Sequence, residues 1–184
     1  AARSEEGFLF PDTYRFYKQG ESRKAVEKIL DNFSQKAWPV LSVPSQLKNL
    51  QQNIIIASLL EKEAPLYRDK QLIAGIIYKR MQLGMALQID ATIVYAKCLG
   101  YFMTCEDPKV YRNDLDFQSP YNTYLHNELP PGPIGNPGLD SIKAALNPIK
   151  SDYLYYLSDP KTKKTIFSKT LEEHIDNRAN YLGV

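Results

Sequence analysis

Apolar residues recur every three or four positions through the first half of the chain, which is the spacing of helices that bury one face. The pattern predicts three helices, over about residues 23–36, 45–64 and 69–83. Ser22 is a candidate N-cap for the first helix, because a serine hydroxyl accepts a hydrogen bond from an unpaired backbone N–H. Pro65 and Gly84 are expected to end the second and third helices. The front of the chain is therefore predicted to be rich in helix.

The middle of the chain carries shorter apolar runs. Residues 85–90 have room for no more than one strand. Asp90 is a candidate N-cap for a short helix that continues through Cys98. A further short helix is expected over residues 141–146, because a proline follows shortly after it.

The end of the chain has the pattern of a hairpin followed by a helix. Residues 153–159 and 164–170 flank the turn sequence Pro-Lys-Thr-Lys, which favours a β-hairpin. Thr170 and Glu173 form a candidate capping box, and the helix that they open is expected to run to about Tyr181.

A long stretch rich in proline and glycine, residues 119–138, is predicted to be a loop. Long ordered loops in compact domains often carry functional residues. Together these elements predict an α+β fold, with one helix-rich domain over residues 1–184, a small antiparallel sheet, and this loop bordering a cleft.

Composition and charge exclude several classes of function. The formal net charge is +2, which argues against nucleic-acid binding because that function normally needs a basic face. The two histidines lie far apart in the sequence, so we expect no metal site. Residues 1–184 contain no run of 18 apolar residues, which is the pattern that would predict a membrane-spanning helix. Cys98 and Cys105 are compatible with a short disulfide or with two buried thiols.

Two glutamates, Glu61 and Glu63, follow a strongly apolar run in the second predicted helix. On a helical wheel Glu63 continues an apolar face, whereas Glu61 lies about 160° away on a more polar side, at roughly 100° per residue. The apolar face consists of Ile56, Leu59 and Leu60. The two carboxylates are therefore expected to meet different surroundings.

The position of Glu63 favours a protonated carboxyl group near neutral pH. Burial against apolar side chains raises the pKa of a carboxylic acid, and the negative end of a helix dipole disfavours a second negative charge. A carboxylic acid that is neutral near pH 7 meets the requirement for a general acid. The alternative is that Glu63 marks the point where a buried helix emerges into solvent, and the wheel alone leaves both readings open.

Other polar residues are compatible with a sugar ligand. Gln88 and Asp90 lie at an expected strand-to-helix junction. Asn122, Thr123 and Tyr124 offer amide, hydroxyl and phenol groups from the loop. The alternatives are a plain N-cap for Asp90 and ordinary turn chemistry for the loop residues.

Five segments occur in an order that resembles a known family. They are EGFLFPDTY (6–14), ASLLEKEA (57–64), IAGIIYKRMQLGMALQID (73–90), SPYNTYLHNELPPGPIGNPGLDSIKAALNP (119–148) and YLYYLSD (153–159). Together they extend over nearly the whole chain and resemble the catalytic domain of the bacterial endolytic murein transglycosylases, the YceG-like family.

The resemblance implies a lytic transglycosylase that cuts within peptidoglycan glycan strands without a cofactor, and it places the essential glutamate of the family at Glu63. It implies substrate-binding or supporting roles for the residues that match the family's motifs: Glu61, Gln88, Asp90, Tyr121, Asn122, Thr123, Tyr124 and Asn136. It also implies a longer protein, anchored in the inner membrane with a LysM-like module before this domain, which faces the periplasm or cell wall. Glycan strands are the expected partner, and cell-wall synthases are candidate protein partners.

The chain departs from the family's pattern at two places. Ala91 stands where the motif after the glutamine usually has proline, so the turn there is expected to differ. Thr165 stands two residues before Phe167, where members often carry a histidine.

The resemblance implies one carboxyl group that acts first as acid and then as base, and a product with a 1,6-anhydro end at N-acetylmuramic acid. The alternative of another class is a non-catalytic glycan-binding or scaffold module in cell-wall assembly. A hydrolase would normally need a second carboxyl group beside the scissile bond. The sequence offers no convincing one, and only Asp90 stays open for that role.

Overall fold

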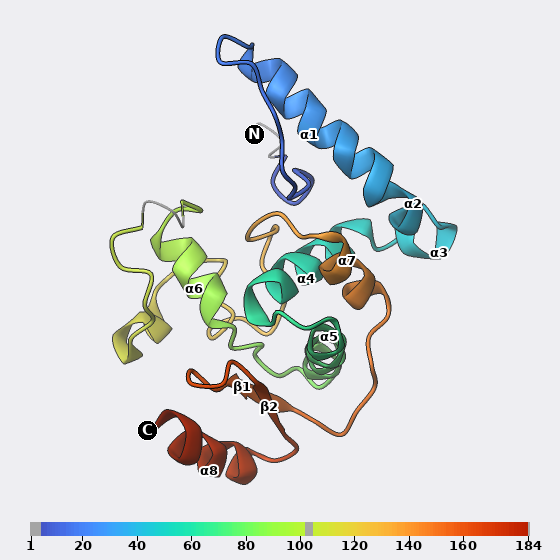
Figure 1. Ribbon diagram of the computed structural model, residues 1–184. Coiled ribbons are helices and arrows are strands. Elements are labelled where there is room, and N and C mark those ends of the chain that lie inside the picture. Colours follow the sequence, from blue (N-terminus) through green and yellow to red (C-terminus); the bar gives the residue numbers. More distant parts are fainter. Residues whose placement is uncertain (1–4, 102–104, 184) are drawn as a thin grey trace.

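Three helices pack together at the centre of the structure (Figure 1). They are α4 (Leu50–Glu63), α5 (Tyr67–Gln82) and α7 (Leu139–Leu146). The computed structural model describes residues 5–101 and 105–183. Within α4 every residue from Asn53 to Leu60 is buried. A helix that is buried on all sides belongs in a core, and the other elements are arranged around α4.

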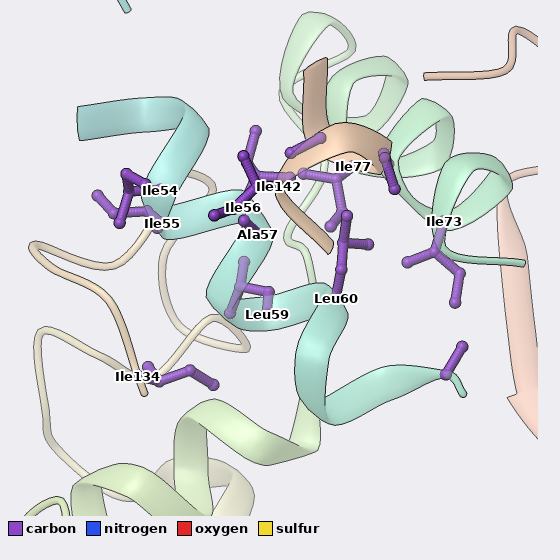
Figure 2. Packing of buried hydrophobic residues seen from close by; sticks show 14 of the residues in the cluster. Ile54, Ile55, Ile56, Ala57, Leu59, Leu60, Ile73, Ile77, Ile134 and Ile142 are labelled. Carbon is purple, nitrogen blue, oxygen red and sulfur yellow. The ribbon is translucent and has the colours of Figure 1, made fainter. Parts of the chain in front are cut away.

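The core between these helices is aliphatic (Figure 2). Ile73 and Ile77 of α5 and Ile142 of α7 belong to the same buried cluster as the isoleucines and leucines of α4. Gly75 allows a close backbone approach on α5, because a Cβ atom there would lie 2.0 Å from the carbonyl oxygen of Ile149. The segment after α7 therefore lies directly against α5.

Smaller elements surround this centre. Helices α1 (Ser22–Lys36), α2 (Trp38–Leu41) and α3 (Pro44–Leu47) precede α4, and α1 extends away from the rest of the molecule (Figure 1). Helix α6 (Asp90–Lys97) and the 3-10 helix η2 (Arg112–Asp116) follow α5. Strands β1 (Tyr155–Ser158) and β2 (Thr165–Ser168) form an antiparallel hairpin, which α8 (Leu171–Leu182) covers (Figure 1).

The predicted fold class is confirmed, because the structure is helix-rich with a small antiparallel sheet. The hairpin is confirmed, with Tyr156 opposite Phe167 in its register. The long stretch 119–138 contains no helix or strand and is a loop as predicted. Gly84 follows α5 with a φ of +66°, a conformation that glycine adopts without strain, so it ends that helix as expected.

Several local predictions are wrong. The second helix does not begin near residue 45, because α3 forms a separate turn and α4 starts at Leu50. Residues 85–90 form a connector without a strand. Ser22 and Asp90 are the first residues of their helices, and the residues before them cap without a side-chain hydrogen bond.

The start of α8 and the two cysteines each have a defined arrangement in the structure. The hydroxyl of Thr170 accepts a hydrogen bond from the N–H of Glu173, so Thr170 is the predicted N-cap of α8. The Glu173 carboxylate accepts from the N–H of Lys169 at 2.7 Å, one residue earlier than a capping box places it. Cys98 and Cys105 form a disulfide, which settles the choice that their spacing left open.

Candidate active site

Glu63 is the last residue of α4, and the extended conformation of Ala64 ends the helix there. The residue is half-buried, and the hydroxyl of Tyr156 on β1 donates a 2.8 Å hydrogen bond to its Oε2 atom. Burial raises the pKa of Glu63 to about 7, against the opposing effect of the Tyr156 hydrogen bond, and the negative charge of Asp90 adds to the rise. Glu63 is therefore partly protonated at neutral pH.

Glu61 has the opposite electrostatic environment, two residues earlier. Its Oε2 atom accepts hydrogen bonds from the hydroxyl of Ser141, from the N–H of Gly138 at 3.1 Å and from Nζ of Lys70 at 3.4 Å. Burial alone would raise the pKa of Glu61, but these donors and the charge of Lys70 hold it below its ordinary value. Gly138 is the N-cap of α7, where the helix dipole also favours a negative charge. Glu61 is therefore an ionised anchor between α4 and α7.

Asp90 at the start of α6 belongs to the same site as Glu63. Its carboxylate accepts a 2.5 Å hydrogen bond from the hydroxyl of Tyr124 in the long loop. Burial raises the pKa of the Tyr124 phenol, and the nearby charges of Asp90 and Glu63 raise it further. The structure thus brings together Glu63, Asp90, Tyr124 and Tyr156 from four separate segments of the chain.

Arg80 of α5 ties these segments to one another. Its side chain is 6% exposed, and it donates to the carbonyl oxygens of Leu154 at 2.8 Å, Ala86 at 3.0 Å and Leu87 at 2.8 Å. Leu154 leads into β1 and Tyr156, and residues 86–87 lead to Asp90. One buried guanidinium therefore sets the position of both elements that flank Glu63.

Gln88 has an unusual backbone conformation between these elements. Its φ is +55°, in the left-handed region that residues with a side chain rarely adopt. The residue is exposed, and its N–H donates to the carbonyl oxygen of Thr123 at 3.0 Å. Strained residues of this kind are frequent at functional sites, and here the strain turns the chain directly before Asp90.

The remaining predicted residues hold the long loop in place. Asn122 is fully buried, and its side chain bonds to the carbonyl oxygens of Leu115 and Phe117 and to the N–H of Tyr124, each at 2.9 Å. The hydroxyl of Thr123 accepts from the N–H of Ile89 at 3.0 Å. Both residues therefore position the loop that carries Tyr124.

Tyr121 and Asn136 belong to the same loop. The ring of Tyr121 packs against Tyr95, with 4.7 Å between the ring centroids. The side-chain oxygen of Asn136 accepts from the N–H groups of Gly7 at 2.8 Å and Leu9 at 3.1 Å. These contacts join the loop to α6 and to the N-terminal segment, and a direct role for either residue in substrate binding stays a prediction.

Sequence patterns alone did not indicate a role for Tyr156 or for the guanidinium of Arg80. Tyr156 lies 93 residues after Glu63, and helical or strand periodicity carries no information about contacts at that separation. Arg80 lies in helical register with the buried isoleucines of α5. An arginine on an apolar face is the signal in the sequence that could have pointed to a buried charge with partners.

The part of the chain that the structure describes has neither a clustered metal-ligand set nor a long apolar helix. Residues 5–101 and 105–183 contain no group of three or more His, Cys, Asp or Glu side chains placed to hold a metal ion. No helix in the same residues is long and apolar enough to cross a membrane.

Comparison with known proteins gives a consistent picture. A sequence profile described as the YceG-like family matches residues 1–180. The chain is 37% identical over 182 residues to a protein of Bacillus subtilis (strain 168) named endolytic murein transglycosylase, in an alignment that includes 97% of this chain and 48% of that protein. A protein of the same name from Streptococcus pneumoniae serotype 2 (strain D39) is 35% identical, over 97% of this chain and 32% of its own length.

The fold is also similar to a solved structure. A crystal structure of a YceG-like protein from Listeria monocytogenes superposes with a TM-score of 0.80 at 38% sequence identity, over 94% of this chain and 55% of that one. The chain thus spans about half or less of the length of the curated relatives that it matches.

Proposed function

The chain belongs to the YceG-like family, and on that premise we propose that it is the catalytic domain of a lytic transglycosylase that cuts within the glycan strands of peptidoglycan. Relatives that carry this activity in their names align with almost all of the chain. The observation that carries the proposal is the carboxyl group of Glu63, which lies at the end of a buried helix with its pKa raised by burial to about 7.

The two glutamates support this assignment by their contrast. A general acid must hold a proton at working pH, and Glu63 does so because burial disfavours its charge. Glu61 is ionised and bound by Ser141, Gly138 and Lys70, so it has no proton to give. Carboxyl groups whose surroundings separate their pKa values commonly divide acid and structural roles in this way.

In the proposed reaction Glu63 donates its proton to the oxygen of the bond between N-acetylmuramic acid and N-acetylglucosamine. The bond from that oxygen to C1 of the muramyl sugar breaks, its electron pair stays on the oxygen, and positive charge develops at C1. Glu63, now a carboxylate, takes the proton of the muramyl C6 hydroxyl while that oxygen attacks C1. The product has a 1,6-anhydro end and no water is consumed.

Asp90 and Tyr124 lie near Glu63, and they are proposed to hold the substrate together with Gln88. The carboxylate of Asp90 is exposed and acts electrostatically on Glu63. A negative charge at that position would also stabilise positive charge at C1. Tyr124 and the exposed side chain of Gln88 offer hydrogen bonds to sugar hydroxyl and N-acetyl groups.

The wider setting is proposed on the same family basis. The chain would act in the bacterial cell envelope as part of a longer, membrane-anchored protein, with glycan strands as its partner and cell-wall synthases as candidate partners. The division of the chain as one domain over residues 1–184, bordered at its cleft by the loop 119–138, is part of this proposal.

Mass spectrometry of the products tests the reaction. Purified peptidoglycan is incubated with the wild-type chain and with Glu63→Gln, and circular dichroism confirms that the variant is folded. We expect anhydromuramyl fragments from the wild type and none from the variant.

Two other results would replace the proposal. Fragments heavier by one water molecule would identify a hydrolase, with Asp90 as the second carboxyl group. Absence of cleavage together with equal glycan binding by both proteins would identify a non-catalytic binding module.

A further inference from the structure

The two oxygens of the Glu63 carboxyl group have different surroundings. Oε2 accepts the 2.8 Å hydrogen bond from Tyr156. Oε1 has no hydrogen-bond partner in the part of the chain that the structure describes, and it is not among the side-chain oxygens there that are buried without a partner. Oε1 is therefore not fully buried and is left without a protein donor among the described residues, whereas Oε2 is bound by the protein.

Tyr156 is a fixed donor in this contact. It lies on β1 opposite Phe167, and its ring packs against the main hydrophobic core. Burial raises the pKa of the Tyr156 phenol well above its ordinary value, and the charge of Glu63 raises it further. The phenol thus keeps its proton over the whole range in which Glu63 titrates.

From this geometry we propose that Tyr156 is a positioning residue for proton transfer, because its hydrogen bond to Oε2 of Glu63 assigns the acid proton to Oε1. The inference rests on the proposed function and adds to it which oxygen exchanges the proton. In a neutral carboxyl group the carbonyl oxygen is the stronger acceptor, so the hydrogen bond from Tyr156 favours Oε2 as the carbonyl oxygen and Oε1 as the hydroxyl.

The assignment has a consequence for each half of the reaction. In the first half the bond between Oε1 and its hydrogen breaks, and the electron pair stays on the carboxylate. In the second half Oε1 takes the proton from the C6 hydroxyl of the substrate. Tyr156 keeps its own proton throughout and stabilises the carboxylate between the two halves, because a hydrogen bond to a charged acceptor is stronger than one to a neutral acceptor.

Tyr156→Phe tests the inference, with Tyr155→Phe as the matched control. Tyr155 is the neighbouring residue of β1, where its ring stacks on His174 with 5.2 Å between centroids and lies under the Arg80 guanidinium. Both variants lose one phenol hydroxyl from the same strand, and that of Tyr155 makes no hydrogen bond among the described residues. Melting temperature and near-ultraviolet circular dichroism report whether each variant is folded.

Two readouts separate positioning from structure. The ¹³C resonance of the Glu63 carboxyl carbon is followed against pH, and kcat and KM are measured against pH on peptidoglycan. For Tyr156→Phe we expect the midpoint of the Glu63 titration and the high-pH limb of kcat to move up by about one pH unit, because a donor to the charged form is lost. We expect kcat to fall by roughly tenfold or more with little change in KM, and no such shift for Tyr155→Phe.

An unchanged Glu63 midpoint in a folded Tyr156→Phe protein would overturn the inference, as would a loss of kcat without movement of the pH limb. The proposed function fails by a different result, namely full cleavage by Glu63→Gln. The carboxyl titration does not depend on turnover, so the two failures are distinguishable.

Discussion

Replacing Glu63 by Gln should change how the stability of the protein depends on pH. The folded pKa of Glu63 is about 7 against an ordinary value of 4.5, so ionisation is harder in the folded state than in the unfolded chain. Below pH 4.5 the residue is neutral in both states. As pH rises toward the folded value the unfolded chain loses its proton first, and the folded state is destabilised relative to it.

The pKa difference between about 7 and 4.5 sets the magnitude. At about 1.36 kcal/mol per pH unit it corresponds to about 3 kcal/mol of unfolding free energy, lost between pH 4.5 and pH 7 and constant above that range. Glutamine does not ionise. The free energy of unfolding of Glu63→Gln, relative to wild type, should therefore rise by about 3 kcal/mol over this window.

Urea-induced unfolding, followed by circular dichroism at about pH 4 and about pH 8.5, measures the change. Glu128→Gln is the control, because it makes the same charge change at an exposed residue without a side-chain hydrogen bond in the described chain. If the difference between Glu63→Gln and wild type is the same at both pH values, the carboxyl group is not held neutral by burial and the basis of the catalytic assignment is lost.

Three further predictions concern other parts of the fold. Glu61→Gln should destabilise the protein by about 1.5–3 kcal/mol at neutral pH, as measured by urea unfolding, because charge-assisted hydrogen bonds are weakened. Since the pKa of Glu61 is lowered, this cost should be present above pH 4.5 and disappear as pH falls through the lowered value; a cost that does not vary with pH would contradict it. Gly75→Ala should lower the free energy of unfolding by about 1–3 kcal/mol, because the added Cβ would meet the Ile149 carbonyl oxygen. This cost exceeds the gain from the better helix propensity of alanine, and an unchanged melting temperature would refute the close approach. Gln88→Gly should raise the free energy of unfolding by up to about 1 kcal/mol, because glycine adopts the positive φ without strain. The same change should reduce cleavage, and equal or higher activity would show that the Gln88 side chain does not hold the substrate.

Local periodicity predicted the helices of this fold well because their apolar faces are continuous. It also separated the two glutamates of α4, and the structure confirms that they face different elements, Glu61 toward α7 and Glu63 toward β1. The start of α4 was misplaced because Pro44 opens a separate turn, although the residues up to Leu50 share a helical pattern with those after it. Tertiary packing determines where α4 begins, and the spacing of apolar residues does not predict it.

The site was predictable in part. Helical geometry pointed to Glu63 as a buried acid, and burial does raise its pKa. The local pattern read Asp90 as an N-cap, because Asp before a helix usually has that role. Its carboxylate instead accepts from Tyr124, 34 residues later in the chain. Pairings such as this one and that of Tyr156 with Glu63 arise from the way the hairpin and loop fold back, which the order of apolar and polar residues does not specify.

The guanidinium of Arg80 connects the mobility of the hairpin to that of the segment before α6. The carbonyl oxygens that it binds belong to both. If either segment moved away while the guanidinium stayed in place, a buried N–H donor of Arg80 would lose its acceptor, which costs free energy. Thermal opening of either segment should therefore expose backbone amides of both at a common rate, as one cooperative unit. A lysine carries all its donors on one nitrogen and could not replace both Nε and Nη1, which bind the two segments separately. Tolerance to substitution at Arg80 should therefore be low.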